Sequence, residues 1–251
     1  QPNQTLVQGM EIQCLNCGTK SSGNYCPVCG QKTSTHRFTM RHIAGQDYLV
    51  SIFYLKRSMF TTLASLFTRP GHTVREYVEG KRVEITNPLS LLVVVVLAFG
   101  FLEHYADYHL MDVVSGDREL ARNLEHLLAE HPKIFYISMI PFYAVISFLL
   151  FRRAGQNFAE HIIMNVFRSV VLVVLTVIHL VTGALVNNLA VMVWVSRAFS
   201  IMGVVYGTWL IYQYFSPFYR NKLLLLLRAL TAYLLPFVLF VFGWVIVEAA
   251  K

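Results

Sequence analysis

The chain has 251 residues and a formal net charge of +7 at pH 7; 55% of its residues are hydrophobic and 14% are charged. Soluble domains carry about 25% charged residues. The composition therefore excludes an ordinary soluble domain and a disordered chain, and four cysteines with 14 glycines exclude a disulfide scaffold and a collagen-like chain. We predict an all-α polytopic membrane protein.

Residues 1–35 are polar and contain every cysteine of the chain, in the pattern C-x2-C-x8-C-x2-C with a glycine after each pair. Two thiolates at the C-x-x-C spacing bind one metal ion from a tight turn, and the glycine permits a positive φ. The pattern predicts a structural zinc ribbon without an open ligand position. A rubredoxin-like iron site and free thiols are the alternatives. The predicted zinc ligands are Cys14, Cys17, Cys26 and Cys29.

Residues 36–87 form a basic connector. Apolar residues recur at helical spacing over 49–67, which predicts an amphipathic helix that lies in the membrane interface or packs on the protein's own helices. Arg69-Pro70-Gly71 ends that helix, a capping box starting at Thr73 begins a two-turn helix, and Gly80 is its C-cap. The connector's basic residues are expected to attract anionic headgroups, at about 1 kcal/mol each, or to contact a partner. They are Arg69, Arg75, Lys81 and Arg82.

Residues 88–251 contain five apolar stretches, which begin after a predicted N-cap at Asn87. A spanning helix needs about 20 apolar residues. Four stretches approach or exceed that length, whereas the first has 14 residues and must borrow flanking residues or be re-entrant. The stretches are 89–102, 134–151, 162–186, 189–214 and 223–247.

Charge asymmetry favours five spans. Residues 1–87, the Arg152-Arg153 loop and the 215–222 loop are basic, while the outer loop at 103–132 holds seven acidic residues against two arginines. Basic segments stay cytoplasmic, so we expect a bacterial inner-membrane protein with its N-terminus inside and its C-terminus outside. Because topology accounts for the basicity, nucleic acid is not an expected partner.

Polar residues within the apolar stretches are candidate functional groups. Arg168 lies close enough to the cytoplasmic end of its span to reach headgroups. His179 and Arg197 flank the turn at Asn187-Asn188 at equal depth, which predicts a hydrogen-bonded cluster or a polar cavity that opens outward. Pro141 and Pro236 predict kinks. The segment 103–109, with its acidic and histidine residues one turn apart, is either a second metal site or a solvated extension.

Several short runs resemble an uncharacterised bacterial family that joins an N-terminal zinc ribbon to several membrane spans. The runs are GNYCPVCGQ at 23–31, LFTRPG at 66–71, REYVEGKR at 75–82 and NP at 87–88. The resemblance covers about residues 14–92, implies the same four zinc ligands and implies no activity. The five-span, N-inside arrangement is also similar to Yip-type membrane proteins.

The sequence contains no H-E-x-x-H motif, P-loop or G-x-S-x-G motif, so we do not expect an enzyme. We expect a membrane-anchored adaptor or assembly subunit of an inner-membrane complex, which docks protein partners through the ribbon and the connector. Lipid or small-solute transport within the helices is the alternative. Replacing Cys14 and Cys17 with serine impairs the first function, whereas Arg197→Leu impairs the second.

Overall fold

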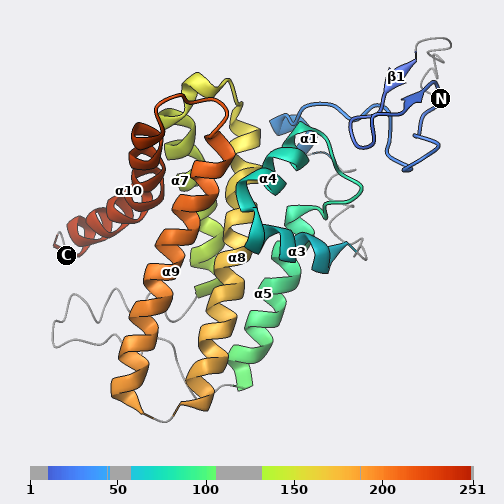
Figure 1. Cartoon of the computed structure of the whole chain (residues 1–251). Helices are drawn as coiled ribbons and strands as arrows, with labels where there is room; N and C mark the ends of the chain where they lie inside the picture. The colour runs from blue at the N-terminus through green and yellow to red at the C-terminus, as the bar shows by residue number, and fades with distance from the viewer. Residues whose placement is uncertain (1–10, 44, 46–57, 106–131, 187, 250–251) are drawn as a thin grey trace.

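The computed structural model describes residues 11–43, 45, 58–105, 132–186 and 188–249 (Figure 1). A small cysteine-containing module (residues 11–35) precedes a largely helical body; it is called the cysteine module below. The elements in chain order are β1 (Ile12–Gln13), β2 (Lys20–Ser21), α1 (Met40–Ile43), α3 (Met59–Thr68), α4 (Pro70–Glu79), α5 (Pro88–Tyr105), α7 (Pro132–Leu150), a short 3-10 turn (Arg152–Ala154), α8 (Phe158–Leu185), α9 (Leu189–Phe215) and α10 (Lys222–Ala249).

Each of the five predicted apolar stretches is helical. Within the described residues, three helices are long and apolar enough to cross a membrane, namely Phe158–Leu185, Ala190–Phe215 and Lys222–Gly243. The apolar parts of α5 and α7 are shorter, at Pro88–His104 and Ile137–Leu150. These helices indicate a multi-pass membrane protein, and the count of five spans stays a prediction.

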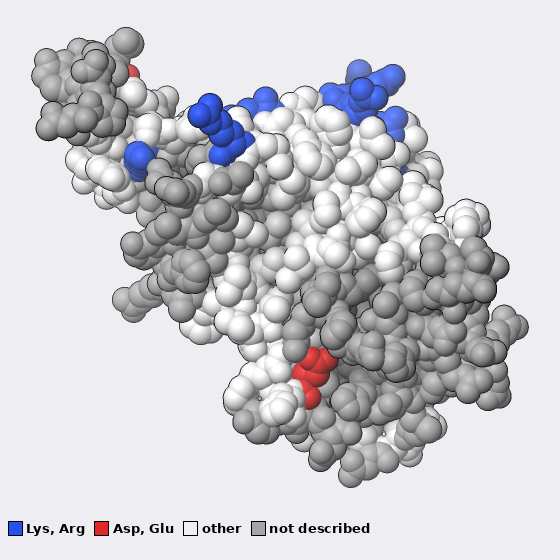
Figure 2. Space-filling model, turned by 180° about the vertical axis from the view of Figure 1, so that it is seen from behind, with Lys and Arg blue, Asp and Glu red and all other residues white. Residues whose placement is uncertain are grey.

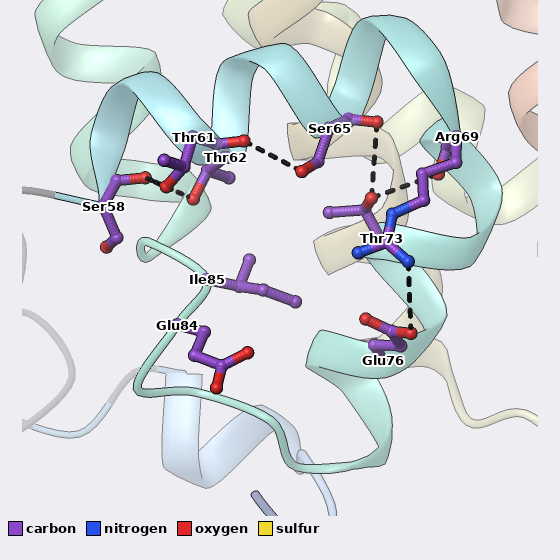
Figure 3. Close-up of a pocket in the computed structure, with 9 residues that line it drawn as sticks. All are labelled: Ser58, Thr61, Thr62, Ser65, Arg69, Thr73, Glu76, Glu84 and Ile85. Carbon is purple, nitrogen blue, oxygen red and sulfur yellow. Dashed lines mark hydrogen bonds and ion pairs between the residues drawn. The ribbon is translucent and has the colours of Figure 1, made fainter. Parts of the chain in front are cut away.

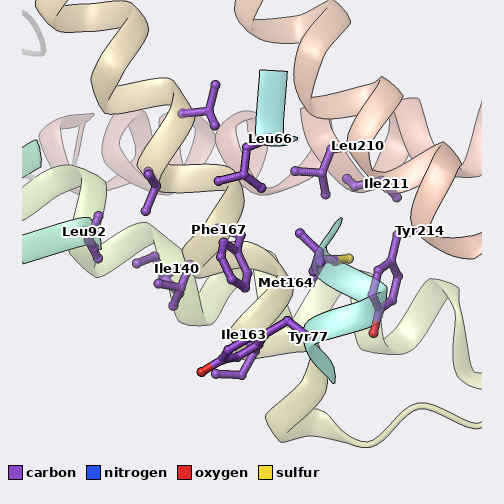
Figure 4. Packing of buried hydrophobic residues seen from close by; sticks show 14 of the residues in the cluster. Leu66, Tyr77, Leu92, Ile140, Ile163, Met164, Phe167, Leu210, Ile211 and Tyr214 are labelled. Carbon is purple, nitrogen blue, oxygen red and sulfur yellow. The ribbon is translucent and has the colours of Figure 1, made fainter. Parts of the chain in front are cut away.

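Helix α8 lies at the centre of the body, where it contacts α5, α7 and α9. Of its most apolar stretch 67% is buried, against 17% for α9 and 22% for α10, so α8 is enclosed by protein on most sides. Figure 4 shows Ile163, Met164 and Phe167 of this helix packed among side chains from the surrounding helices. An Asn157–Glu160 capping box begins α8.

Helices α3 and α4 form a hairpin that packs on α8 and α9. As predicted, the chain breaks at Arg69 (φ −146°) and Gly80 ends α4 with a left-handed φ of 119°. The predicted capping box at Thr73 is wrong. Helix α4 begins four residues earlier, with Arg69 in place of Thr73 as its N-cap, because Pro70 has a φ suited to the first helical position. The Thr73 hydroxyl instead donates to the Arg69 carbonyl at 3.1 Å.

The predicted connector helix over 49–67 is described only from Met59, where α3 begins; its earlier part lies outside the described residues. Asn87 caps α5 as predicted, since its side-chain oxygen accepts the Leu89 N–H at 2.9 Å. Pro141 and Pro236 lie inside α7 and α10. Most of the segment 103–109, including the acidic and histidine side chains beyond α5, also lies outside the described residues.

Candidate metal centre and its attachment to the helices

The four cysteine side chains converge on one point. Their sulfur atoms all lie within 4.8 Å of one another. The Cys14–Cys29 and Cys17–Cys26 sulfur pairs are 3.6 Å and 3.5 Å apart. A tetrahedral zinc ion with bonds of 2.3 Å separates its sulfur ligands by about 3.8 Å. The residues present therefore fit a four-thiolate metal site.

The site consists of two copies of one turn, at residues 14–19 and 26–31. In each copy the N–H of the first cysteine donates to the carbonyl five residues later, at 2.9 Å and 2.8 Å. Its own carbonyl accepts the N–H of the following glycine at 2.9 Å in both copies. Gly18 and Gly30 have φ values of 75° and 73°, as the spacing predicts. Flanking backbone pairs repeat too, Gln13 with Lys20 and Tyr25 with Lys32.

Electrostatics explains why these thiols favour a cation. Hydrogen bonds from the side chain and backbone of Thr19 lower the pKa of the Cys17 thiol to about 6. At Cys29 a backbone hydrogen bond from Gln31 opposes the rise, but desolvation and the neighbouring sulfurs raise the pKa to about 12. Without a bound cation, the mutual repulsion of four sulfurs this close prevents all of them from being thiolates at once. A divalent ion removes the repulsion and converts all four to ligands.

Gln31 attaches the cysteine module to the helical body. Its side chain is 4% exposed. The amide nitrogen donates to the Gly80 carbonyl at 2.8 Å, and the amide oxygen accepts the Arg82 N–H at 3.0 Å. Any Cβ at Gly80 would lie 2.6 Å from the Leu15 side chain, so the module packs directly on the end of α4.

Residues 36–38 make a second attachment. The Arg37 guanidinium contacts both carboxylate oxygens of Glu160, with one N–O distance of 2.7 Å, and this hydrogen bonding raises the pKa of Arg37. Phe38 stacks on Tyr77 of α4 at 5.5 Å, and the Arg82 guanidinium lies 3.7 Å from the Phe38 ring centre. The cysteine module is thus fixed to the end of α4 and the start of α8.

The four predicted basic contact residues have partners within the protein. Arg69 and Lys81 both lie near the Glu76 carboxylate, at 3.9 Å and 3.6 Å. Arg75 donates to the Tyr214 carbonyl of α9 at 3.1 Å, and Arg82 bridges the module to α4 as described above. Arg75 and Arg82 thus join this segment to other parts of the protein, whereas Arg69 and Lys81 pair within it; headgroup binding by the four residues stays a prediction.

Arg168 differs from the expectation. It is 1% exposed and does not reach the surface. Its guanidinium lies 3.5 Å from the ring centre of Tyr143 on α7 and 5.5 Å from that of Tyr233 on α10. Its Nε and Nη1 atoms have no hydrogen-bond partner within the described residues. The guanidinium thus contacts aromatic rings instead of lipid headgroups, and hydropathy alone does not predict these contacts.

His179 and Arg197 do lie at neighbouring levels of α8 and α9, but they have different partners. The His179 Nε2 atom is 2.9 Å from the Ser196 hydroxyl, and its ring stacks on Phe199 at 4.9 Å. Arg197 is exposed and its guanidinium lies 5.0 Å from the Trp194 ring centre. The predicted hydrogen-bonded cluster therefore joins His179 to Ser196, the residue before Arg197, in place of Arg197 itself.

A buried polar cluster between α7 and α8 was missed in the sequence. The Ser147 hydroxyl is 2.9 Å from His161 Nδ1, and the Asn165 amide donates to the same hydroxyl at 3.2 Å. All three side chains are 1% exposed, so a substrate cannot reach this serine and histidine. His161 packs against Phe215 at 5.6 Å. The sequence did contain one sign of this cluster, because its three polar residues lie near the facing ends of two consecutive apolar stretches.

Residues 57–100 match a family described as "Protein of unknown function (DUF3667)". No curated protein and no solved structure gives a significant match to the chain. The matched stretch confirms the expected likeness to a family of unknown function. It contains α3, α4 and most of α5, together with the contacts of the cysteine module at Gly80 and Arg82, and it does not include the cysteines.

Proposed function

We propose that this protein is a membrane-anchored adaptor or assembly subunit, without catalytic activity, that presents its cysteine module to a protein partner. The observation that carries the proposal is the unequal burial of the module. Gln31 is 4% exposed against the helices, while Tyr25, just before the second turn, and Val28, within it, are 63% and 69% exposed. A rigidly held module with exposed apolar side chains suits protein recognition.

The charge of the module supports a protein partner over nucleic acid. Its basic side chains between residues 11 and 35 are Lys20 and Lys32, and Lys20 pairs with Glu11 at 3.1 Å. Binding to nucleic acid relies on several cations facing phosphates. We further propose that the bound ion is zinc, since four thiolates with closed tetrahedral coordination are typical of structural zinc sites.

We propose five spans in a bacterial inner membrane, with the module in the cytoplasm and the C-terminus outside. Figure 2 supports this orientation, because the lysine and arginine side chains visible on this face gather toward one end of the body, whereas acidic side chains appear at both ends. Basic segments are retained on the cytoplasmic side. Reporter fusions at the two termini test the proposal: opposite compartments are expected, and a shared compartment would rule out an odd number of spans.

Affinity purification in mild detergent tests the adaptor function. Val28→Asp places a charge on the exposed turn without removing a ligand, so it should abolish recovery of the co-purifying protein while the metal content is unchanged. Replacing Cys14 and Cys17 with serine should abolish both. Arg197→Leu is the control and should recover the same partner. If Val28→Asp recovers that partner in normal amounts, the exposed turn is not the docking surface.

Lipid or small-solute handling is the second candidate, and Arg168 is the observation that favours it. A buried guanidinium whose Nε and Nη1 atoms have no partner among the described residues is costly in a helical body. An anionic ligand that passes between the helices would satisfy it. Under this alternative, Arg168 variants impair activity whereas variants of the cysteine module do not.

A further inference from the structure

A groove lies between α3, α4 and the loop that leads into α5 (Figure 3). Its volume is about 340 Å³, which is within the range of small-ligand sites. Among the residues that the structure describes, those that line the groove fall between residues 58 and 85, within the stretch that matches the family. The groove is separate from the cysteine site and from the polar residues of α8 and α9.

The hydroxyl groups of three residues that line the groove donate their hydrogens to backbone carbonyls. Thr61 donates to the Ser58 carbonyl at 2.8 Å, Ser65 to the Thr61 carbonyl at 2.8 Å, and Thr73 to the Arg69 carbonyl at 3.1 Å. A hydroxyl has one hydrogen and two lone pairs. These three side chains therefore offer a ligand acceptors only.

Two carboxylates add further acceptors. Glu84 is exposed at the groove and makes no hydrogen bond or ion pair with the described part of the chain. Glu76 lies across the groove, with Arg69 at 3.9 Å and Lys81 at 3.6 Å (Figure 3). Because Glu76 already lies near two cations, Glu84 is the carboxylate whose charge is unshared within the described residues, and a ligand that fits here can bring hydrogen-bond donors and one positive charge. A primary ammonium group brings three donors and no acceptor.

Arg69 can bind an anionic group that lies beside the ammonium group of a ligand. Its side chain is 58% exposed, and its contact with Glu76 is long for an ion pair, so most of its five N–H donors remain available. Guanidinium groups bind phosphate through paired hydrogen bonds. The groove thus combines acceptors for an ammonium group with a donor for a neighbouring phosphate.

We propose that the α3–α4 groove binds a primary ammonium group joined to a phosphate, as in the ethanolamine headgroup of a phospholipid or in free phosphoethanolamine. The aromatic side chain of Phe60 on α3 is 75% exposed and suits insertion at a lipid surface. This site goes beyond the adaptor function and does not depend on it.

Native mass spectrometry of the purified full chain tests the proposal. The protein in mild detergent is mixed with equal amounts of phosphatidylethanolamine, phosphatidylcholine and phosphatidylglycerol, and the retained lipid is counted. Phosphatidylcholine is the control for charge, because its headgroup also joins a cation to a phosphate but its quaternary ammonium has no N–H donor. A hydrogen bond to a charged group contributes about 1.5–3 kcal/mol. The ethanolamine lipid should therefore be retained at least about tenfold better than the choline lipid.

Two pairs of variants locate the binding. Glu84→Gln should reduce retention of phosphatidylethanolamine about tenfold, while Glu79→Gln, at the exposed end of α4 outside the groove, should not change it. Thr61→Val should weaken binding, and Thr68→Val, which removes an equivalent exposed hydroxyl of α3, should not. Unchanged metal content and unfolding temperature show that each variant is folded.

Competition with free phosphoethanolamine distinguishes the two sources. Thermal stabilisation by free phosphoethanolamine, lost in Glu84→Gln, together with no lipid preference assigns the site to the soluble compound. Equal retention of the three lipids without such stabilisation overturns the proposal. So does a preference for phosphatidylglycerol, or an ethanolamine preference that survives Glu84→Gln.

Discussion

Arg37, eight residues beyond the last cysteine, forms a two-oxygen ion pair with Glu160, whose carboxylate also accepts the Asn157 N–H that begins α8. Glu160 is 2% exposed, whereas the Arg37 side chain is 57% exposed. The same buried carboxylate therefore caps the most enclosed helix and attaches the cysteine module to it.

Removing the arginine from this pair should destabilise the attachment. Arg37→Met leaves the Glu160 carboxylate with one fewer charged partner, and we expect a loss of about 2 kcal/mol, reduced from the cost of a fully buried pair because Arg37 is half exposed. Thermal unfolding in detergent measures it. Arg41→Met, at an exposed position of α1, is the control. Equal unfolding temperatures for the two variants would show that the ion pair adds nothing.

The metal centre should hold one ion per chain and release it in acid. Thiolates are the ligands, so protons compete with the metal, and the metal should be released as a falling pH protonates the four sulfurs. At pH 7.5 the site should be loaded. Metal analysis after dialysis over a series of pH values from 7.5 to about 3 measures this. A chain that keeps its metal in full at the acid end of the series would contradict a site made only of these four thiols.

Local pattern predicted the helices and the cysteine turns, because each depends on neighbouring residues. The C-x-x-C-G spacing specifies a turn with a positive φ, and both Gly18 and Gly30 have one. Tertiary contacts were not predictable in this way. The Arg37–Glu160 pair joins residues 123 positions apart, and the burial of Arg168 depends on tyrosines from two other helices.

The start of α4 shows how two local signals compete. Thr73 and Glu76 have the spacing of a capping box, yet Pro70 already has the φ of a first helical residue. The helix therefore begins at Pro70, and Thr73 lies inside it. The proline was the better indicator, because it fixes the backbone without needing a partner.

Gly71 should be required for the contact between α4 and α9. A Cβ at this position would lie 2.3 Å from the Tyr214 backbone nitrogen, and backbone atoms cannot move aside. We expect Gly71→Ala to lower the free energy of unfolding by about 1–3 kcal/mol. Gly243→Ala is the matched control, since nothing lies within 4 Å of its Cβ position in α10. If both variants unfold at the same temperature, the close α4–α9 approach is absent in the protein.

Arg168 should be coupled to Tyr143 by a cation–π interaction. Its guanidinium is 3.5 Å from the centre of that ring, and desolvated contacts of this kind contribute about 2 kcal/mol. A double-mutant cycle measures the coupling. Tyr143→Leu should destabilise the wild-type chain by about 2 kcal/mol more than it destabilises the Arg168→Met chain.

Arg168→Met alone separates structural stability from a functional role of the charge. The methionine keeps much of the arginine's length and removes the donors of Nε and Nη1, which have no partner in the described part of the chain. Replacing unsatisfied buried charge with an apolar side chain is often neutral or stabilising. We therefore expect an unfolding temperature equal to or above that of the wild type. A large decrease would mean that the aromatic contacts outweigh the two unpaired donors, and the charge would then need no ligand to explain its position.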